Sequence, residues 1–317
     1  MSILLGLDIG GTKCAVSVGE EAAEGIRILR REAIATPKDQ RTAMEAMLAL
    51  AGKLAQGQAV AGVGISAGGP LDAESGMLCN PPNLPGWHKL SLTRMASDAL
   101  HAPSVLENDA NACALAEWRW GAGQGSRVMA FLTFGTGLGA GIVLDGHILR
   151  GATGDAGELG HWRLSGFGPS GYGKAGSFEG YCSGGGLGQL AVTIGERYCQ
   201  QGMAPSYVLA GAYDAKTVAD AARAGDAAAL EVFRVCGESL GRGLALLVDF
   251  LNPDRIVLGS IYARCSDLLT PPMEAVLRAE SLPRSLAACS VKPAALGESI
   301  GDYAALALAK QAADKPC

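Results

Sequence analysis

The chain has 317 residues, of which 49% are hydrophobic and 18% are charged, and its formal net charge is −5. This length allows two ordinary domains with substantial cores, and the composition excludes an intrinsically disordered protein. A basic nucleic-acid binder is excluded as well, because no stripe of lysine and arginine is visible in the sequence.

The cysteines and the apolar segments predict a cytoplasmic protein without a membrane span. Nine cysteines occur without a C-x-x-C pair, which indicates reduced thiols. The first apolar run has no basic segment before it and soon meets Asp8, so it predicts a first strand rather than a signal peptide. The longest apolar stretch, 244–251, contains Asp249 and is too short to span a bilayer.

The first predicted element is a β-hairpin over 3–18 with a glycine turn at 10–13 (GGTK). A similar hairpin is predicted over 128–144, with its turn at 135–137 (GTG). Glycine permits positive φ angles and lets backbone N–H groups approach a phosphate. One such turn is a weak signal, but two of them, one in each half of the chain, suggest two domains that bind one nucleotide.

Between the hairpins, strand and helix patterns alternate. In chain order they predict a strand over 26–36, a helix over 40–56, a strand over 59–70, a proline-rich loop over 81–87 and a helix over 107–120. The last of these is expected to open at Asn108 or Asp109, because both residue types are good N-caps.

The second half follows a similar plan. After its hairpin it has a glycine-rich irregular stretch at 151–186, helices over about 214–223 and 226–251, a buried strand over 255–260 and a final helix from Gly301. Strands followed by helices in both halves predict an α/β protein of two similar domains, with a short hinge near 118–127.

Three short patterns imitate motifs of other functions. Residues 64–68 match the G-x-S-x-G nucleophile elbow, but Gly69-Pro70 follows in place of a helix. Residues 168–175 lack the Ser/Thr of a Walker loop, and the run at 135–141 leads into a strand, not into the helix of a dinucleotide site. We therefore do not expect a serine hydrolase or a Rossmann domain.

Four motifs occur together: DIGGTK at 8–13, ENDANA at 107–112, the glycine loop at 135–141 and GELGH at 157–161. In this order they resemble the ROK family of sugar kinases and repressors, which belongs to the actin-like ATPase and hexokinase fold group. The resemblance covers nearly the whole chain. It implies an α/β fold of two actin-like ATPase (ribonuclease H-like) domains around a central cleft.

On this basis we expect two domains with unequal sizes. The small N-terminal α/β domain is predicted to comprise residues 1–118 plus 301–317, so that the C-terminal helix returns to it. The large C-terminal α/β domain is predicted to comprise residues 119–300.

Phosphoryl transfer needs phosphates that are positioned and neutralised. The turn chemistry and the resemblance together assign ATP and phosphate binding to Asp8, Gly10, Gly11, Thr12, Lys13, Thr136, Gly137, Gly139, Gly259 and Ser260. Asp8 stands at a strand end beside the first turn, where it is suited to hold Mg²⁺ directly or through water. The LGS run at 258–260 departs from the family's three glycines.

Asp109 is the candidate catalytic residue. A hexose hydroxyl has a very high pKa, so a base must accept its proton as the bond to phosphorus forms. Taken alone, Asp109 reads as a helix cap, but within ENDANA it stands at the family's base position. The two roles are compatible, because a helix N-terminus keeps a carboxylate ionised.

A sugar pocket needs side chains and open backbone that hydrogen-bond to hydroxyl groups. The resemblance implies sugar contacts at Gly68, Gly69, Asn83, Asn108, Asp109, Glu158, His161 and Glu179.

One departure concerns metal binding. Many members of the family hold a structural zinc with a histidine and three cysteines, but Ser170, Tyr172 and Ser177 stand at the cysteine positions here. Serine and tyrosine cannot replace thiolates in a tetrahedral zinc site. We therefore expect no structural zinc, and we expect His161 to be a neutral sugar ligand held by the packing of its own loop.

The resemblance implies an ATP-dependent hexose kinase of the glucokinase or hexokinase type. Its expected substrates are ATP with Mg²⁺ and the 6-hydroxyl of glucose, with mannose, fructose, allose and N-acetylhexosamines as alternatives. The sequence leaves open polyphosphate as the phosphate donor.

Two other functions are considered. A sugar-responsive repressor of the same family carries a helix-turn-helix before the first strand, and we expect none because this strand starts at residue 3. A silent sugar-binding protein is disfavoured by the retained Asp8 and Asp109. The family resemblance also implies a homodimer or a larger homo-oligomer, with no nucleic-acid or membrane partner.

Overall fold

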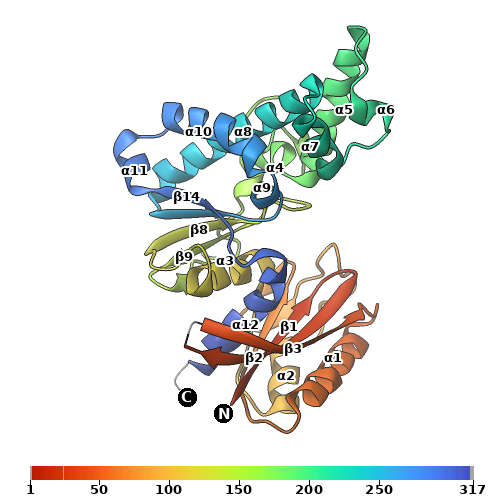
Figure 1. The fold of residues 1–317 in the computed structure, drawn as a ribbon. Coiled ribbons are helices and arrows are strands. Elements are labelled where there is room, and N and C mark those ends of the chain that lie inside the picture. Colours follow the sequence, from red (N-terminus) through yellow and green to blue (C-terminus); the bar gives the residue numbers. More distant parts are fainter. Residues whose placement is uncertain (1, 24, 315–317) are drawn as a thin grey trace. The chain divides into compact units, whose positions relative to one another are not determined.

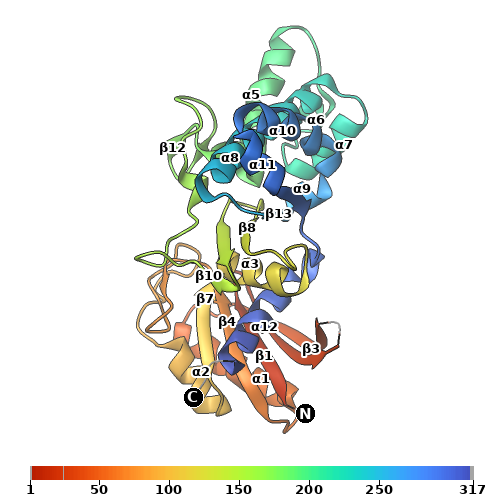
Figure 2. The ribbon, with the colours of Figure 1, turned by 90° about the vertical axis from the view of Figure 1, so that its left-hand side faces the viewer.

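The computed structural model describes residues 2–23 and 25–314, which contain two five-stranded sheets (Figures 1 and 2). The elements up to residue 148 are β1 (Ile3–Ile9), β2 (Lys13–Ala22), β3 (Gly25–Ala35), α1 (Gln40–Ala55), β4 (Val60–Ala67), β5 (Leu71–Asp72), β6 (Met77–Leu78), α2 (Leu92–Leu100), β7 (Ser104–Asn108), α3 (Asp109–Trp120), β8 (Val128–Leu132), β9 (Ala140–Leu144) and β10 (His147–Ile148).

The remaining elements are mostly helical. They are the 3₁₀ helix η1 (Leu159–His161), β11 (Ser170–Gly171), β12 (Lys174–Ala175), α4 (Phe178–Tyr181), α5 (Gly184–Gln200), α6 (Ser206–Leu209), α7 (Ala215–Arg223), α8 (Ala227–Leu251), β13 (Arg255–Leu258), α9 (Ile261–Arg264), α10 (Ser266–Glu280), α11 (Pro283–Ala288), β14 (Ser290–Pro293), η2 (Gly297–Ser299) and α12 (Ile300–Ala313).

The chain forms two compact units. Unit 1 comprises Met1–Gly125, Gly141–Ala156 and Ala295–Cys317, and unit 2 comprises Ser126–Ala140 and Gly157–Ala294. The helix α12 therefore belongs to the same unit as the first strand. The sequence-based division into 1–118 plus 301–317 and 119–300 stays a prediction for independently folding domains.

The first sheet has the strand order β3-β2-β1-β4-β7. The strands β1 and β2 form the predicted hairpin, in which Ile9 pairs with Cys14, and β3 continues it antiparallel. The strands β4 and β7 run parallel to β1. Because parallel strands end at the same edge of a sheet, the residues after β1, β4 and β7 are brought together there.

The helix predicted over 107–120 opens at the expected place, with Asn108 as its N-cap. Glu107 and Asn108 still belong to β7, where they pair with Ser66 and Ala67 of β4. Asn108 is the N-cap, since its side chain accepts a hydrogen bond from the N–H of Ala110, and the helix α3 starts at Asp109. Parallel pairing thus extends the strand up to the cap.

Side chains of β1 alternate between two helical layers. Leu5 and Leu7 are fully buried in the core that also contains Met44 of α1. Leu4 points to the other face, where it packs in a cluster with Leu306 of α12. In Figures 1 and 2, α12 lies across β1 and β4 of this sheet. Asp8 has the same parity as Leu4, so its side chain faces α12 as well.

Glycines let α12 approach the sheet closely. A Cβ atom at Gly6 of β1 would lie 2.8 Å from the Cβ of Ala305. A Cβ at Gly64 of β4 would lie only 2.0 Å from the carbonyl oxygen of Ala305, and one at Gly62 would lie 2.3 Å from that of Ala309. The main-chain approach of this helix to β1 and β4 thus depends on residues without side chains.

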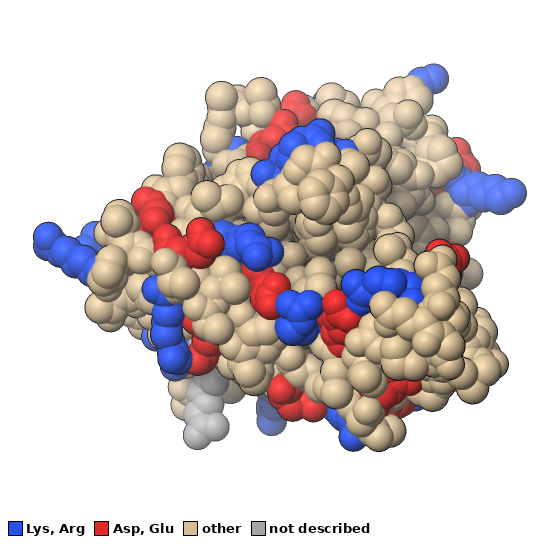
Figure 3. All heavy atoms as spheres, turned by 90° about the horizontal axis from the view of Figure 1, so that it is seen from above, with Lys and Arg blue, Asp and Glu red and all other residues tan. Residues whose placement is uncertain are grey.

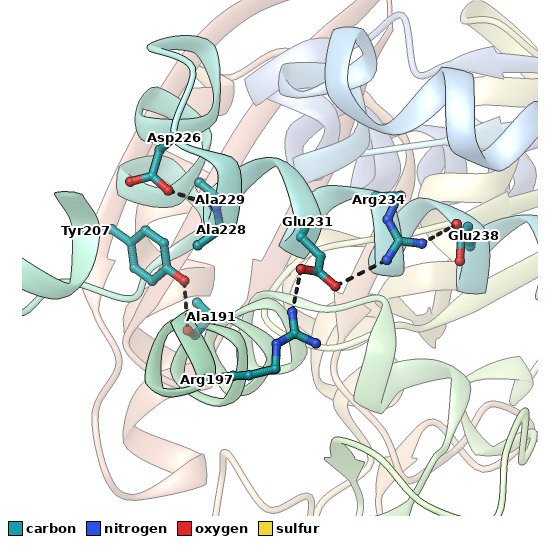
Figure 4. Close-up of polar contacts among 9 residues, drawn as sticks. All are labelled: Ala191, Arg197, Tyr207, Asp226, Ala228, Ala229, Glu231, Arg234 and Glu238. Atoms are coloured by element: carbon teal, nitrogen blue, oxygen red, sulfur yellow. Dashed lines mark hydrogen bonds and ion pairs between the residues drawn. The ribbon is translucent and has the colours of Figure 1, made fainter. Parts of the chain in front are cut away.

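The second five-stranded sheet has the strand order β10-β9-β8-β13-β14, in which β13 is parallel to both β8 and β14. An ion pair between Arg197 and Glu231 joins the helices α5 and α8, and further pairs along α8 extend it (Figure 4). Glu231 of α8 binds Arg197 of α5 and also Arg234, which donates to Glu238 at 2.6 Å. Exposed pairs of this kind orient helices more than they stabilise them.

On the face drawn in Figure 3, lysine and arginine side chains alternate with aspartate and glutamate, and no continuous basic patch is seen among the residues drawn in colour. Within the described ranges, no helix has both the length and the apolar composition that crossing a membrane requires.

We expect Gly64→Ala to destabilise unit 1 strongly, because the new methyl group meets the backbone of α12. Overpacking against main chain costs roughly 2–4 kcal/mol of unfolding free energy. The matched control is Gly52→Ala in α1, where a Cβ meets nothing within 4 Å, so a gain of about 0.5–1 kcal/mol is expected. Chemical denaturation measures both, and equal stabilities for the two variants would contradict the close packing.

Candidate functional site

In unit 1 the predicted residues gather at the carboxyl edge of the parallel strands. Asp8 is the last residue but one of β1 and is half-buried beneath the start of α12. A Cβ at Gly301 would lie 3.1 Å from its Oδ2 atom, so glycine at this place keeps the carboxylate accessible. The structure confirms that Asp8 stands at a strand end directly before the glycine turn.

The carboxyl group of Asp8 has unusual electrostatics. Burial raises its pKa from 3.8 to about 6, and the negative charges of Asp109 and Asp302 add to the shift, against Arg31 and Lys13. Within 2–23 and 25–314, no hydrogen bond or ion pair reaches this carboxyl group. A half-buried carboxylate without a partner is suited to a cation, and Mg²⁺ commonly takes one or two carboxylates together with substrate phosphates.

The first glycine turn is held from both sides. The N–H of Gly10 donates to the carbonyl of Lys13 at 3.1 Å, and the hydroxyl of Thr36 donates to the carbonyl of Gly10 at 2.6 Å. Gly11, Thr12 and Lys13 are exposed. A Cβ at Gly11 would lie 2.8 Å from the carbonyl oxygen of Asn83, so the proline-rich loop after β6 packs directly on the turn.

Asn108 and Asp109 stand where β7 gives way to α3. The carboxylate of Asp109 accepts the N–H of Ala110 at 2.8 Å, and Asp109 is still open to solvent. Loss of hydration raises the pKa of Asp109, while the N–H of Ala110 opposes this shift. A Cβ at Gly69 would lie 3.3 Å from the Nδ2 atom of Asn108, and Gly68 faces open space. The structure thus brings these four predicted residues together.

Sequence reasoning missed the ion pair of Glu107 with Arg150, which fixes the end of β7. Glu107 is 2% exposed, and its Oε2 receives two hydrogen-bonding nitrogens of Arg150, at 2.8 Å and 2.6 Å. Its Oε1 accepts the N–H of Asn108 at 3.0 Å and the amide of Asn111 at 3.1 Å. A glutamate inside a buried strand does signal that a partner exists, but nothing in the sequence identifies Arg150.

In unit 2 the second turn is stiffened by Thr133. The N–H of Gly139 donates to the hydroxyl of Thr133 at 3.0 Å, and the N–H of Thr133 donates to the carbonyl of Gly139 at 2.9 Å. Glu179 also reaches this turn, because its Oε2 accepts the N–H of Leu138 at 2.9 Å. A Cβ at Gly137 would lie 2.7 Å from that oxygen. The turn has no charged residue of its own, but the carboxylate of Glu179 is hydrogen-bonded to it.

Gly259 and Ser260 approach the same turn. The N–H of Gly259 donates to the carbonyl of Leu132 at 2.9 Å. Ser260 has a φ of 51°, and a Cβ at Gly135 would lie 3.6 Å from its hydroxyl oxygen. In unit 2 the predicted phosphate residues are therefore neighbours.

His161 ends the short helix η1. Its Nε2 lies 3.8 Å from a carboxylate oxygen of Glu158, and its ring stacks on Tyr172 with 4.6 Å between ring centroids. A Cβ at Gly160 would lie 2.5 Å from the carbonyl of Leu138, so η1 packs on the second turn. The structure thus places Glu158, His161 and Glu179 around this turn.

The residues at the implied cysteine positions have other partners. The hydroxyl of Ser177 accepts the N–H groups of Gly171 and Gly180 at 3.1 Å and 3.0 Å and caps α4. Ser170 is bonded on both backbone atoms to the amide of Gln189. In the part of the chain that the structure describes, no group of three or more His, Cys, Asp or Glu side chains is arranged to hold a metal ion.

The family model described as ROK family matches residues 4–312 of the chain. A glucokinase of Halalkalibacterium halodurans is 32% identical over 306 residues, which are 94% of this chain and 92% of the glucokinase.

Solved structures are similar over nearly the whole chain. A ROK family glucokinase from Streptomyces griseus, in complex with glucose and AMPPNP, is 33% identical, has a TM-score of 0.76 and is matched over 98% of this chain and 100% of its own. A ROK family transcriptional regulator, homologous to the MLC protein of E. coli, is 25% identical with a TM-score of 0.85, over 98% of this chain and 78% of the regulator. The predicted α/β fold is thereby confirmed.

Asp8→Asn is expected to change the pH dependence of stability. Between pH 3.8 and about 6 the folded chain keeps the Asp8 proton that the unfolded chain has lost, so the unfolding free energy falls as pH rises through this interval. Above about pH 6 the ionised Asp8 keeps the unfolding free energy lower by on the order of 1–3 kcal/mol. The variant should therefore unfold at a higher temperature than the parent at pH 7.5, and the difference should vanish below pH 4.

Thermal unfolding in metal-free buffer measures this effect. The control is Asp39→Asn, at an exposed N-cap where hydrogen bonds from Thr42 lower the pKa. Asp39→Asn should not raise the thermal unfolding temperature at pH 7.5. The same stability for Asp8→Asn and the parent at both pH values would disprove the electrostatic cost of Asp8.

Proposed function

The chain belongs to the ROK family and is an ATP-dependent hexose kinase, and we propose that it phosphorylates the 6-hydroxyl of glucose or of a related hexose. The choice of glucose is supported by relatives that are named glucokinases and by the bound glucose of the Streptomyces griseus enzyme. A primary hydroxyl is also the least hindered acceptor of a hexose.

The observation that carries the mechanism is Asp109 at the first residue of α3, open to solvent and with a raised pKa. In the proposed step the hydroxyl oxygen forms a bond to the γ-phosphorus, the bond from phosphorus to the ADP oxygen breaks, and Asp109 accepts the hydroxyl proton. A higher pKa makes the carboxylate a better acceptor for that proton. Glu107, which is paired with Arg150, fixes the backbone of Asn108, the residue directly before Asp109.

For the phosphates we assign the turn from Gly10 to Lys13 in unit 1, whose last three residues are exposed. In unit 2 we assign Thr136, Gly137 and Gly139 with Gly259 and Ser260. Asp8 is the residue that would hold Mg²⁺, either directly or through water. An ion held there would neutralise charge on the phosphates. No zinc is assigned to any residue.

For the sugar we assign polar groups that lie at loop positions of each unit. In unit 1 these are Gly68, Gly69, Asn83, Asn108 and Asp109, and in unit 2 they are Glu158, His161 and Glu179. Carboxylate, amide and imidazole groups supply both acceptors and donors, which several adjacent hydroxyl groups of a hexose require.

We also propose that the protein acts as a cytoplasmic homodimer or larger homo-oligomer. An exposed apolar group on unit 2 supports association: Phe250 and Leu246 lie one turn apart on α8 and are 82% and 50% exposed, and Leu282, bonded through its N–H to Asp249, is 58% exposed. Free thiols at the described cysteines support a reducing compartment. Sedimentation of the purified protein tests the assembly.

The likeness to the transcriptional regulator keeps sugar-dependent repression as a second candidate. A repressor binds sugar and DNA but does not turn over ATP. Catalysis therefore separates the two functions.

The deciding experiment couples ADP release to a panel of hexoses, with glucose, mannose, fructose, allose and N-acetylated hexosamines as acceptors. We expect turnover with ATP and Mg²⁺ that is fastest on glucose or a close relative. Polyphosphate replaces ATP in a parallel series. If no hexose gives ADP above the rate with water as acceptor, the kinase function is disproved.

Asp109→Asn is expected to lower kcat by about 100- to 10,000-fold, because the asparagine amide cannot accept the proton. Sugar affinity should change little, and the thermal unfolding temperature should not fall, because a carboxylate with a raised pKa does not stabilise the fold by ionising. Steady-state kinetics and calorimetric glucose binding measure the two effects.

The matched control is Asp98→Asn, whose carboxylate is exposed on α2. It should keep the parent kcat. If Asp109→Asn has near-parent rates, Asp109 only supports the start of α3.

A further inference from the structure

The side chain of Tyr172 has an unusual setting for an aromatic residue. It lies in the two-residue loop between β11 and β12 in unit 2 (labelled β12 in Figure 2), and it is 69% exposed. Core packing therefore does not account for the ring.

The backbone at this position also disfavours tyrosine. In the hairpin, Ser170 pairs with Ala175 and Gly171 with Lys174, which leaves Tyr172 and Gly173 as the two central residues, with φ angles of 49° and 68°. Two-residue loops with both φ angles positive favour Asn-Gly or Asp-Gly. A bulky residue at positive φ is an outlier whose strain other contacts must offset.

The main contact of the ring is with His161. The two rings are stacked, with centroids 4.6 Å apart and an angle of 24° between their planes. The same hairpin holds the backbone of His161, because Nζ of Lys174 donates to its carbonyl at 2.7 Å. The imidazole is thus held between the ring of Tyr172 and the carboxylate of Glu158, 3.8 Å from its Nε2.

The hairpin is itself firmly attached to unit 2. Gln189 of α5 accepts the N–H of Ser170 and donates to its carbonyl, both at 2.9 Å. The fully buried hydroxyl of Ser177 accepts the N–H of Gly171 at 3.1 Å. Because the hairpin is anchored in this way, the ring of Tyr172 restricts the orientations of the imidazole of His161.

We propose that Tyr172 is a positioning residue, which fixes the imidazole of His161 by stacking so that it meets a sugar hydroxyl in one orientation. The sugar contact of His161 rests on the proposed function. This role explains why tyrosine stands in the strained turn. Asparagine would form the turn better, but it would leave the imidazole of His161 free to rotate.

Tyr172→Asn is therefore a test in which folding and function move in different directions. The variant has the preferred Asn-Gly turn, so its thermal unfolding temperature should equal or exceed that of the parent. Its KM for the hexose should rise about tenfold, the loss expected for one aromatic contact. KM for ATP should stay unchanged.

Two further variants serve as controls. Tyr172→Phe keeps the ring and should restore the parent KM for the hexose. Phe167→Asn removes a neighbouring aromatic side chain that is 81% exposed, and it should have no effect. The proposal is overturned if Tyr172→Asn keeps the parent KM, or if Tyr172→Phe is as impaired as Tyr172→Asn.

A measurement without substrate separates this proposal from the kinase function. The chain has four histidines, so the imidazole signals of His161 can be assigned by NMR with a His161→Gln variant. Stacking on Tyr172 should shift them upfield in the parent and in Tyr172→Phe, but not in Tyr172→Asn. Absence of turnover in the parent refutes the kinase function alone, whereas unchanged shifts in Tyr172→Asn refute the role of Tyr172.

Discussion

The close packing of α12 on β1 and β4 is the constraint on which unit 1 depends. Gly6, Gly62 and Gly64 remove the side chains that would keep the helix away, and alanines of α12 meet them. The alternation along β1 then turns Asp8 toward the first residues of this helix, next to Gly301. A contact between distant parts of the sequence thereby decides where the half-buried carboxylate of Asp8 lies.

The same edge of the sheet concentrates negative charge. Asp8 and Asp109 both have raised pKa values, because loss of hydration disfavours their charged forms. Asp8 also has no hydrogen-bonding partner among the described residues. Such an arrangement weakens the fold in the absence of ligands and favours cations and proton transfer in their presence. Glu107 differs, because Arg150 and backbone donors satisfy it fully. The site thus contains acids without a cationic partner and one acid that an arginine neutralises.

Periodicity and turn chemistry predicted both hairpins, α1, α8 and α12, because these elements have clear apolar spacing and glycine or aspartate at their ends. They did not predict α10, which contains Pro271 and Pro272 and is held by packing on Gly237 of α8. They also missed α5, which begins with three glycines after Ser183. In the site, local pattern alone left Asp109 as a helix cap, and the family resemblance was needed to assign it. Arg150 and the stacking of Tyr172 on His161 arise from tertiary contacts that spacing does not encode.

The position of α12 has a consequence for synthesis of the chain on the ribosome. Residues 157–294, which make up most of unit 2, are made before residues 300–313. The sheet of unit 1, although made first, therefore keeps one apolar face uncovered while the whole of the other unit emerges. Domains commonly fold as they emerge, and exposed apolar surface invites aggregation. The nascent chain should thus need a chaperone at its oldest segment, not at its newest.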